Sequence, residues 1–206
     1  MEALAFARNS GPVATGVIKV NPQDFQVDEL LGFDPKTDGD TECPHEWLQI
    51  KKTGINTSYL AQVLAQSAGC KLRDVGYSGM KDRRAVTTQW FSLPVNDKVP
   101  TADIANFVSK ELQGTQQSVE LLASVRHAKK LKRGVHRKNR FKIVIRDVQG
   151  LDESVLSRIR HQGIPNYFGG QRFGIHFANL PKAEAMFEKD PRRVNRDQRS
   201  IYLSTA

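Results

Sequence analysis

The sequence predicts an α/β (α+β) fold in which a mixed β-sheet carries helices on one side. Strand-like alternation and helical spacing of apolar residues follow one another irregularly along the 206 residues. Strand-like segments also occur in close pairs, which argues against a doubly wound sheet. Apolar residues make up 39% of the chain and charged residues 26%, the usual composition of a globular protein.

The first half of the chain combines strand signals with one capped helix. The alternating segments are bounded by Pro, Gly and Asp, which favour turns. Asn56 precedes an apolar segment that ends at Gly69, so it is expected to cap a helix, although Asn56-Thr57-Ser58 also matches a glycosylation sequon. The predicted strands are residues 17–20, 25–30, 47–52 and 86–93, with a surface loop over 32–42 and a helix over 59–65.

The second half repeats this mixture. Apolar residues at helical spacing predict a helix over 101–112. A second helix is predicted over 153–161, before Gly163. Further strands are predicted over 119–126 and 141–148, and helical tails over 180–187 and from 198 onward.

Charge and cysteine content narrow the class of protein. The net charge of +9 favours a polyanionic partner. The two cysteines form no Cys-x-x-Cys pair, which predicts a reducing cytoplasm without disulfides or thiolate-bound metal. No stretch reaches the roughly 18 apolar residues of a membrane span, and the first residues lack the basic start of a signal peptide. We therefore expect a cytoplasmic protein that does not contact membranes.

Residues 121–146, here called the basic belt, carry ten cations and no acid. One interpretation is a solvated charged hairpin. The other, which the length of the run favours, is contact with a nucleic-acid backbone. Phe141 lies within the belt and could stack on an unpaired base, but its alternation with Ile143 and Ile145 favours a core-facing position on pattern alone. The cations are Arg126, Lys129, Lys130, Lys132, Arg133, Arg137, Lys138, Arg140, Lys142 and Arg146.

A second polar cluster surrounds Asp82, which lies among Lys81, Arg83 and Arg84. Neighbouring cations keep a carboxylate ionised, as a nucleophile or base requires. On these residues alone, a surface turn with local ion pairs is the favoured interpretation. The five histidines show no metal-ligand spacing, and there is no phosphate-binding Gly-x-x-x-x-Gly-Lys motif.

Three long motifs, in series, resemble those of the tRNA pseudouridine synthase D family. The segment Gly-Tyr-Ser-Gly-Met-Lys-Asp-Arg-Arg-Ala-Val-Thr-Thr-Gln at 76–89 is similar to the family signature. The other two motifs are residues 19–29 and 166–174, and the shorter segments 52–57 and 139–141 lie where the family has similar runs. The resemblance covers nearly the whole chain in the right order.

The resemblance implies a pseudouridine synthase core with a mixed, largely antiparallel sheet. It implies conversion of a uridine in the D arm of tRNA, at position 13, without cofactor or metal. Residues 1–160 are expected to form the catalytic core, and 161–206 the start of an inserted domain whose remainder, with the later part of the core, is missing. A monomer is favoured. The alternative is a non-catalytic RNA-binding fragment of such an enzyme.

The resemblance also implies roles for particular residues. Asp82 matches the catalytic aspartate, which attacks the flipped-out uridine or its sugar. Lys19 is expected to face Asp82 and keep it ionised, and Phe141 to stack on the target base, which reverses the interpretation from pattern alone. Asn139 is expected to hold the active-site loop or contact the base. The remaining expected contacts with substrate or RNA are Lys81, Arg83, Phe168, Gln171, Arg172 and Phe173.

Overall fold

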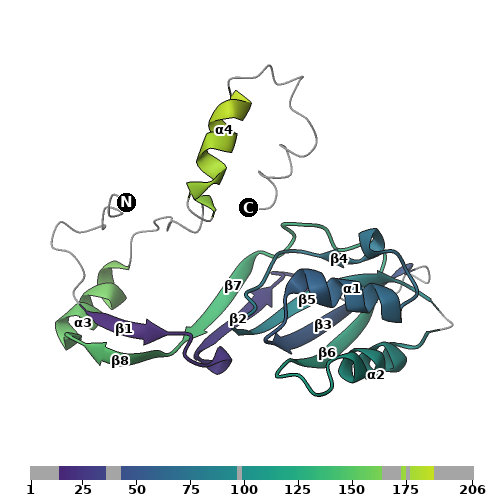
Figure 1. The fold of residues 1–206 in the computed structure, drawn as a ribbon, viewed down its shortest axis with the longest axis horizontal. Coiled ribbons are helices and arrows are strands. Elements are labelled where there is room, and N and C mark those ends of the chain that lie inside the picture. The colour runs from purple at the N-terminus through teal and green to yellow at the C-terminus, as the bar shows by residue number, and fades with distance from the viewer. Residues whose placement is uncertain (1–13, 36–42, 97–98, 164–172, 175–176, 188–206) are drawn as a thin grey trace. The chain divides into compact units, whose positions relative to one another are not determined.

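A computed structural model describes residues 14–35, 43–96, 99–163, 173–174 and 177–187. The chain divides into two compact units, one of residues 16–147 and one of residues 1–15 and 148–206. Figure 1 shows the fold. In chain order the elements are β1 (Thr15–Ile18), β2 (Phe25–Leu30), β3 (His45–Thr53), α1 (Thr57–Ser67), β4 (Gly76–Tyr77), β5 (Val86–Pro94), α2 (Thr101–Glu111), β6 (Ser118–His127), β7 (Lys138–Ile143), β8 (Ile145–Gln149), α3 (Glu153–Gln162) and α4 (Asn179–Phe187).

The central sheet lies in the unit of residues 16–147. Its strands follow the order β6-β3-β5-β2-β7, and the short strand β4 also pairs with β5. Only the β2–β5 pair is parallel among these pairings, and the others are antiparallel. The prediction of a mixed, largely antiparallel sheet is confirmed.

The predicted strand over 141–148 is instead two strands with different partners. β7 pairs with β2, whereas β8 pairs with β1 in a two-stranded sheet. The break falls at Val144, whose N–H donates to the carbonyl of Asp24 rather than to a strand of the sheet. The Arg146 guanidinium then bonds both Asp24 carboxylate oxygens, at 2.9 and 2.7 Å. Alternation continues through the break, so pattern alone could not locate it.

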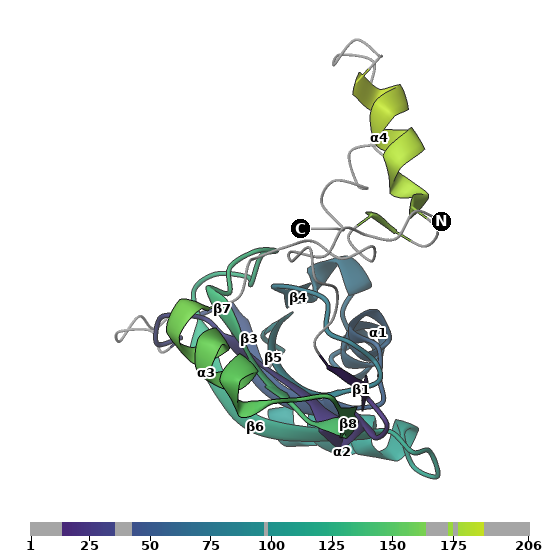
Figure 2. The same cartoon turned by 90° about the vertical axis from the view of Figure 1, so that its left-hand side faces the viewer.

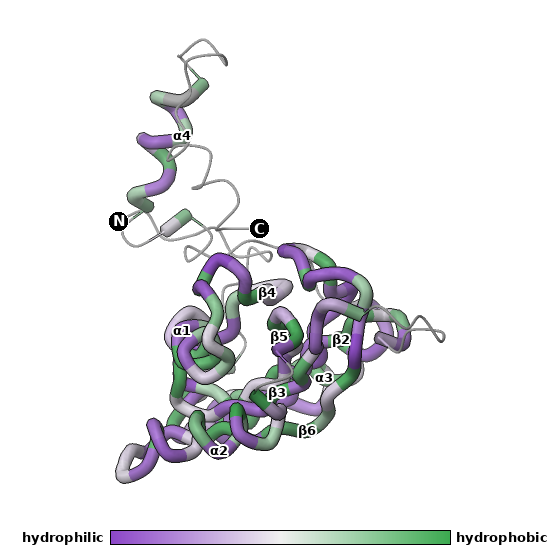
Figure 3. The backbone as a smooth tube through the Cα atoms, turned by 90° about the vertical axis from the view of Figure 1, so that its right-hand side faces the viewer, coloured by the Kyte–Doolittle hydropathy of each residue, from purple (hydrophilic) through white to green (hydrophobic). Residues whose placement is uncertain are grey.

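The two faces of the central sheet bury different clusters. One face packs Leu48 and Phe91 against α1 and α2. The other face buries Trp47 and Trp90 with Leu131. Successive strand residues point to opposite faces, so adjacent residues such as Trp47 and Leu48 enter different clusters. Figure 2 shows α1 and α2 beside the sheet, and Figure 3 shows hydrophilic and hydrophobic residues mixed along both helices, as expected for helices with one buried side.

One edge of β5 changes its partner midway, and this creates a fork in the sheet. β2 pairs with β5 at residues 86–88. β4 pairs with the same strand at residues 91–92. The loop of residues 78–85 leaves β4 and returns into β5, so it begins and ends beside this fork. A loop held at both ends by the sheet is a suitable place for functional side chains.

Gly76 allows β4 to approach the chain at Leu131. A Cβ atom added at Gly76 would collide with the carbonyl oxygen of Leu131 and the hydroxyl of Ser92. We therefore expect Gly76→Ala to lower the free energy of unfolding by about 1–3 kcal/mol, as overpacking does. Denaturant titration measures this. The exposed Ser118→Ala serves as control, with an expected change within about 0.5 kcal/mol. Equal stability of both variants would contradict the close packing.

Candidate active site

Asp82 forms an ion pair with Lys19 at the surface of the fork. Lys19 Nζ lies 2.8 Å from Asp82 Oδ2, and the two side chains are 29% and 41% exposed. The same ammonium lies 4.0 Å from the centre of the Phe25 ring. Lys19 has a φ of 58°, a left-handed conformation that costs energy for a residue with a Cβ and that recurs at functional sites. The aspartate is therefore oriented by a cation that itself packs on an aromatic ring.

Phe141 and Asn139 lie on the same face of the sheet as Phe25, the residue whose ring contacts Lys19. In the antiparallel β2–β7 register, Phe141 is opposite Val27 and Asn139 is opposite Glu29. Directly opposite residues point to the same side. The rings of Phe25 and Phe141 meet edge to face, with centroids 6.1 Å apart. Phe141 is 56% exposed, so its ring offers a free surface for stacking. The core-facing position favoured by pattern alone does not hold.

A cleft of about 720 Å³ adjoins this ion pair. Lys19, Arg83 and Arg84 line it, and no acidic residue is among its lining residues. Arg83 Nε donates to the carbonyl of Gly54 at 3.3 Å, which orients one of these cations. A cleft with cations on its walls favours the phosphates of a nucleic acid. The other lining residues are Val20, Asn21, Pro22, Gly54, Gln116 and Gln117.

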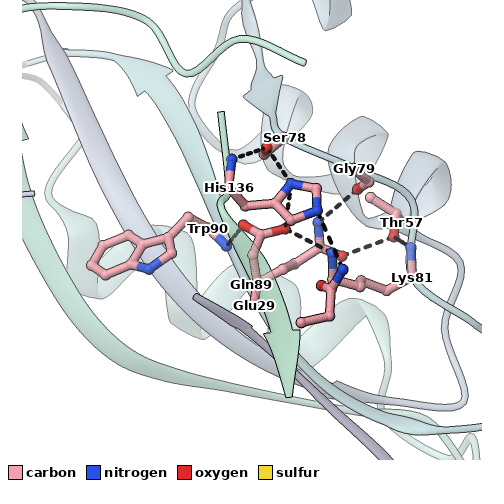
Figure 4. A network of polar contacts seen from close by, with 9 residues as sticks. Glu29, Thr57, Ser78, Gly79, Lys81, Gln89, Trp90 and His136 are labelled. Carbon is pink, nitrogen blue, oxygen red and sulfur yellow. Dashed lines mark hydrogen bonds and ion pairs between the residues drawn. The ribbon is translucent and has the colours of Figure 1, made fainter. Parts of the chain in front are cut away.

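A buried ion pair lies at the fork itself. Lys81 Nζ donates to Glu29 Oε2 at 2.8 Å, and the two side chains are 4% and 0% exposed. The other carboxylate oxygen of Glu29 accepts the backbone N–H of Trp90 at 3.1 Å. Trp90 lies between the β5 residues that pair with β2 and those that pair with β4. Figure 4 shows Glu29 between Trp90 and the loop. Glu29 therefore satisfies a backbone donor that the fork leaves without a strand partner.

The backbone of the loop is held at several points. Thr57 Oγ1 accepts the N–H of Lys81 at 3.0 Å and donates to Gln89 Oε1 at 2.8 Å. Gln89 Nε2 donates to the carbonyl of Gly79 at 3.2 Å. Lys52 Nζ donates to the carbonyls of Ile55 and Asp82, at 2.7 and 3.3 Å. These contacts come from α1, β3 and β5, so three elements fix the backbone that carries Asp82.

His136 connects this loop to Asn139. Its Nδ1 lies 2.5 Å from Ser78 Oγ, and its Nε2 lies 3.3 Å from Asn139 Nδ2. Burial, and then the charge of Lys81, hold the pKa of His136 below its usual value, although Glu29 opposes this. The ring is therefore neutral at pH 7. A neutral ring that accepts the Asn139 N–H at Nε2 carries its proton on Nδ1 and donates it to Ser78.

Lys52 is a buried cation that forms no ion pair with any carboxylate of the described residues. Desolvation, and then repulsion by Lys81, lower the pKa of Lys52 to about 8. The charge of Asp82 acts in the opposite direction. An ammonium in this position adds positive potential directly beneath the loop that carries Asp82.

The structure brings together most residues expected from the sequence. Lys19, Asp82, Asn139 and Phe141 surround the fork, and Arg83 lines the adjoining cleft. The Lys81 ammonium points to Glu29, and the residue is 8% exposed, so its contact with RNA stays a prediction.

The remaining expected residues belong to the other unit of the chain. Phe173 stacks on Phe177, with ring centroids 6.2 Å apart. Phe168, Gln171 and Arg172 lie outside the described residues. The roles expected for these four residues stay predictions, as does the division of the chain at residue 160.

Sequence reasoning missed Glu29, Lys52 and His136. Two of them had a signal in the pattern. Glu29 lies two residues after Val27, so both point to the buried face of their strand. Lys52 follows Leu48 and Ile50 at the same spacing and points inward with them. A charged residue at a core-facing position is seldom placed there without a partner. His136 had no such signal, because it lies in a loop.

The described part of the chain holds no group of three or more His, Cys, Asp or Glu residues arranged to bind a metal ion. Among the helices of the described residues, none is long and apolar enough to cross a membrane.

A solved structure shares this fold. It is that of the putative tRNA pseudouridine synthase D from Methanosarcina mazei, matched with a TM-score of 0.58 and 22% identity, covering 92% of this chain and 45% of that one. This similarity shows that the chain has the same fold class as the Methanosarcina mazei protein.

Sequence comparison then identifies the family. The family model described as tRNA pseudouridine synthase D (TruD) matches residues 5–194. The chain is 45% identical over 194 residues to tRNA pseudouridine synthase D of Methylococcus capsulatus, covering 93% of this chain and 51% of the relative. It is 41% identical over 197 residues to the Proteus mirabilis protein of the same name, covering 95% and 53%. The chain belongs to the tRNA pseudouridine synthase D family, and it spans about half the length of these curated relatives.

Removal of one partner tests the buried ion pair. Lys81→Met leaves the Glu29 carboxylate buried without its cation, so we expect the free energy of unfolding to fall by about 3–5 kcal/mol. The double variant Glu29→Gln/Lys81→Met should recover part of this loss, since the uncharged amide oxygen can still accept the Trp90 N–H. The exposed Lys51–Glu120 pair, at 3.1 Å, provides the control. Lys51→Met should cost less than about 1 kcal/mol. Equal losses in both single variants would contradict the structural role of the buried pair.

Lys52 should make stability depend on pH in the alkaline range. Its pKa is about 8 in the folded chain and 10.5 in the unfolded chain, so the unfolded chain binds more protons between these values. The folded state therefore gains stability as pH rises through this window. Below pH 8 the folded chain carries the full free-energy cost of burying the charged Lys52 ammonium. Relative to Lys52→Met, we expect a gain of about 3 kcal/mol between pH 7 and pH 10.5, measured by denaturant titration. Exposed Lys110→Met should show no such difference, and parallel curves for wild type and Lys52→Met would contradict the shift.

Proposed function

We propose that the protein isomerises a uridine of tRNA to pseudouridine, with Asp82 as the nucleophile. The observation that carries the proposal is the Lys19–Asp82 pair at 2.8 Å, mounted on a loop that three elements hold in place. Membership of the tRNA pseudouridine synthase D family supplies the class of reaction. Exposed Phe141 and the cationic cleft supply a stacking surface and a phosphate-binding wall beside the same carboxylate.

The reaction breaks the bond between N1 of uracil and C1′ of the ribose and forms one between C5 and C1′. A proton leaves C5 and N1 gains one, so atoms balance within the substrate and no oxidant or reductant is needed. The Asp82 carboxylate attacks the uridine or its ribose, and the detached uracil rotates before it rejoins. The target base must first leave its stack. Phe141 then holds the extruded base, which limits where the freed ring can move.

Further specificity belongs to the same proposal. We include in the proposal that the target is the D-arm uridine at position 13 and that the enzyme acts in the cytoplasm, as expected from the sequence motifs. Phe168, Gln171, Arg172 and Phe173 contribute to RNA binding, as their motif resembles the family's. No cofactor is required for the chemistry. Asn139 orients the base or the loop, because His136 holds its amide.

A second candidate function is RNA binding without catalysis. It is favoured by one observation: cations and no acidic residue line the cleft beside Asp82, which would attract RNA whether or not a reaction follows. Under this alternative, the cationic cleft and the basic belt bind tRNA, but no pseudouridine forms.

The variant Asp82→Asn distinguishes the two functions. It keeps the size of the side chain and the backbone bond to Lys52 but removes the nucleophilic carboxylate. We expect pseudouridine formation in unmodified tRNA to fall by at least ~10³-fold, while tRNA affinity changes little. Carbodiimide mapping of the product and fluorescence anisotropy measure the two quantities. Asp103→Asn, at an exposed position on α2, should retain activity. Wild-type activity in Asp82→Asn would overturn the assignment, and tRNA binding by a wild-type chain that forms no pseudouridine would favour the second function.

A further inference from the structure

The connection between β6 and β7, residues 128–137, carries the densest part of the basic belt and is firmly anchored. The indole N–H of Trp47 donates to the carbonyl of Lys129 at 2.8 Å. Leu131 is buried between Trp47 and Trp90, and its N–H donates to Ser92 Oγ at 2.9 Å. These contacts argue against the interpretation of this connection as a solvated charged hairpin, which would not be anchored to the core. The backbone that carries the cations of this connection is therefore held in a defined position.

Further anchors join the connection to the loop that carries Asp82. The N–H of Gly134 donates to the carbonyl of Ser78 at 2.8 Å, and the N–H of His136 donates to Ser78 Oγ at 2.7 Å. Ser78 follows β4 and precedes Asp82 in one loop. The position of the cationic connection and the position of Asp82 are thus set by the same short segment.

A pocket of about 460 Å³ opens between this connection and β4. Its lining includes three apolar residues, the exposed Leu72 and the buried Val75 and Leu131. Lys130, Lys132 and Arg133 line it as well, and none of its lining residues is acidic. The Arg133 guanidinium lies 3.9 Å from the centre of the Tyr77 ring. Lys130 Nζ is hydrogen-bonded to the Arg73 carbonyl. The remaining lining residues are Ser58, Gly76 and Tyr77.

We propose that this pocket binds one unpaired nucleotide of the RNA, separate from the nucleotide that reacts at Asp82. This inference rests on the proposed function for its choice of RNA as partner. The volume falls in the range of roughly 300–1,000 Å³ that is usual for small-molecule sites. The stacked Tyr77–Arg133 pair offers a flat surface to a base, and the apolar lining residues offer it contact area away from water. Lys132 and Arg133 offer charge to its phosphate.

The chain between the two sites limits their separation. Tyr77 and Asp82 are five residues apart, so their Cα atoms lie at most about 18 Å from each other. The pocket nucleotide and the reacting uridine can therefore belong to one single-stranded region. Binding in the pocket would hold that region open, which a base-extruding enzyme requires.

The test measures binding in the Asp82→Asn background, so it does not depend on turnover. The probes are a fluorescein-labelled single-stranded oligouridylate and unmodified tRNA, both followed by fluorescence anisotropy. The variants are Arg133→Ala and Arg133→Lys. Lys110→Ala, at an exposed position on α2, removes the same charge elsewhere and is the matched control. Thermal melts establish that each variant is folded.

We expect Arg133→Ala to weaken oligouridylate binding roughly tenfold, in line with the loss of one stacked base. Its salt dependence should fall by about the 0.7 that one phosphate contact contributes on a single strand. Arg133→Lys should keep the salt dependence but still bind more weakly, because it loses the planar stack. Lys110→Ala should change the affinity less than about twofold. Equal effects of Arg133→Ala and Lys110→Ala would overturn the proposal and leave only a general positive field.

A crosslink gives an independent result. When 4-thiouridine replaces uridine in the oligonucleotide, irradiation should attach it to the peptide that contains Tyr77 or to the one that contains Arg133, as read by mass spectrometry. Crosslinks confined to the segment around Phe141 would overturn the second site. Displacement of the oligouridylate by polyglutamate at equal concentration would also overturn it, because the pocket would then bind any polyanion. Failure of the proposed function would appear differently, as absent pseudouridine formation by the wild-type chain with intact oligouridylate binding.

Discussion

The buried ion pair between Glu29 and Lys81 is the interaction on which the candidate site depends. β5 exchanges β2 for β4 along one edge, and the exchange leaves the Trp90 N–H without a strand partner. The Glu29 carboxylate accepts that N–H and binds the Lys81 ammonium. Burying two charges costs desolvation free energy that their attraction only roughly offsets, so the pair adds little net stability. Its effect is to specify one conformation, because any other arrangement of the loop leaves a buried charge alone.

Two charged residues near the loop, Lys81 and Lys52, are buried and hold it in place, whereas Lys19 and Asp82 are partly exposed. Lys81 is neutralised internally by Glu29, and Lys52 is satisfied by backbone carbonyls beneath Asp82. Lys19 and Asp82 pair with each other, and both side chains are partly exposed. A carboxylate that stays accessible while its backbone is rigidly held meets the geometric requirement for a nucleophile. The surrounding cations favour a substrate that carries phosphates.

The two loops at the fork act as one unit. Ser78 accepts the backbone N–H groups of Gly134 and His136, and it contacts the His136 ring through its hydroxyl. The first loop carries Asp82, and the second leads into Asn139 and Phe141 on β7. The positions of Asp82, Phe141 and the cationic pocket are therefore set by shared contacts. A change in one loop is expected to shift the other, since the hydrogen bonds of Ser78 join their backbones directly.

The sequence by itself determined the kinds of element and most of their positions, and its net charge of +9 led us to expect a polyanionic partner. Alternation and capping report local conformation, and they located β2, β3, β5, α1, α2 and β6 within a few residues. The motif around Asp82 and the basic belt were visible because each is contiguous. The tertiary structure decided which distant residues meet. Lys19 and Asp82 are 63 positions apart, and Glu29 and Lys81 are 52 apart. A periodic pattern cannot show strand β4, which has two residues, nor the change of partner between β7 and β8. The fork, and with it the role of Glu29, follows from long-range pairing of strands, which no local signal encodes.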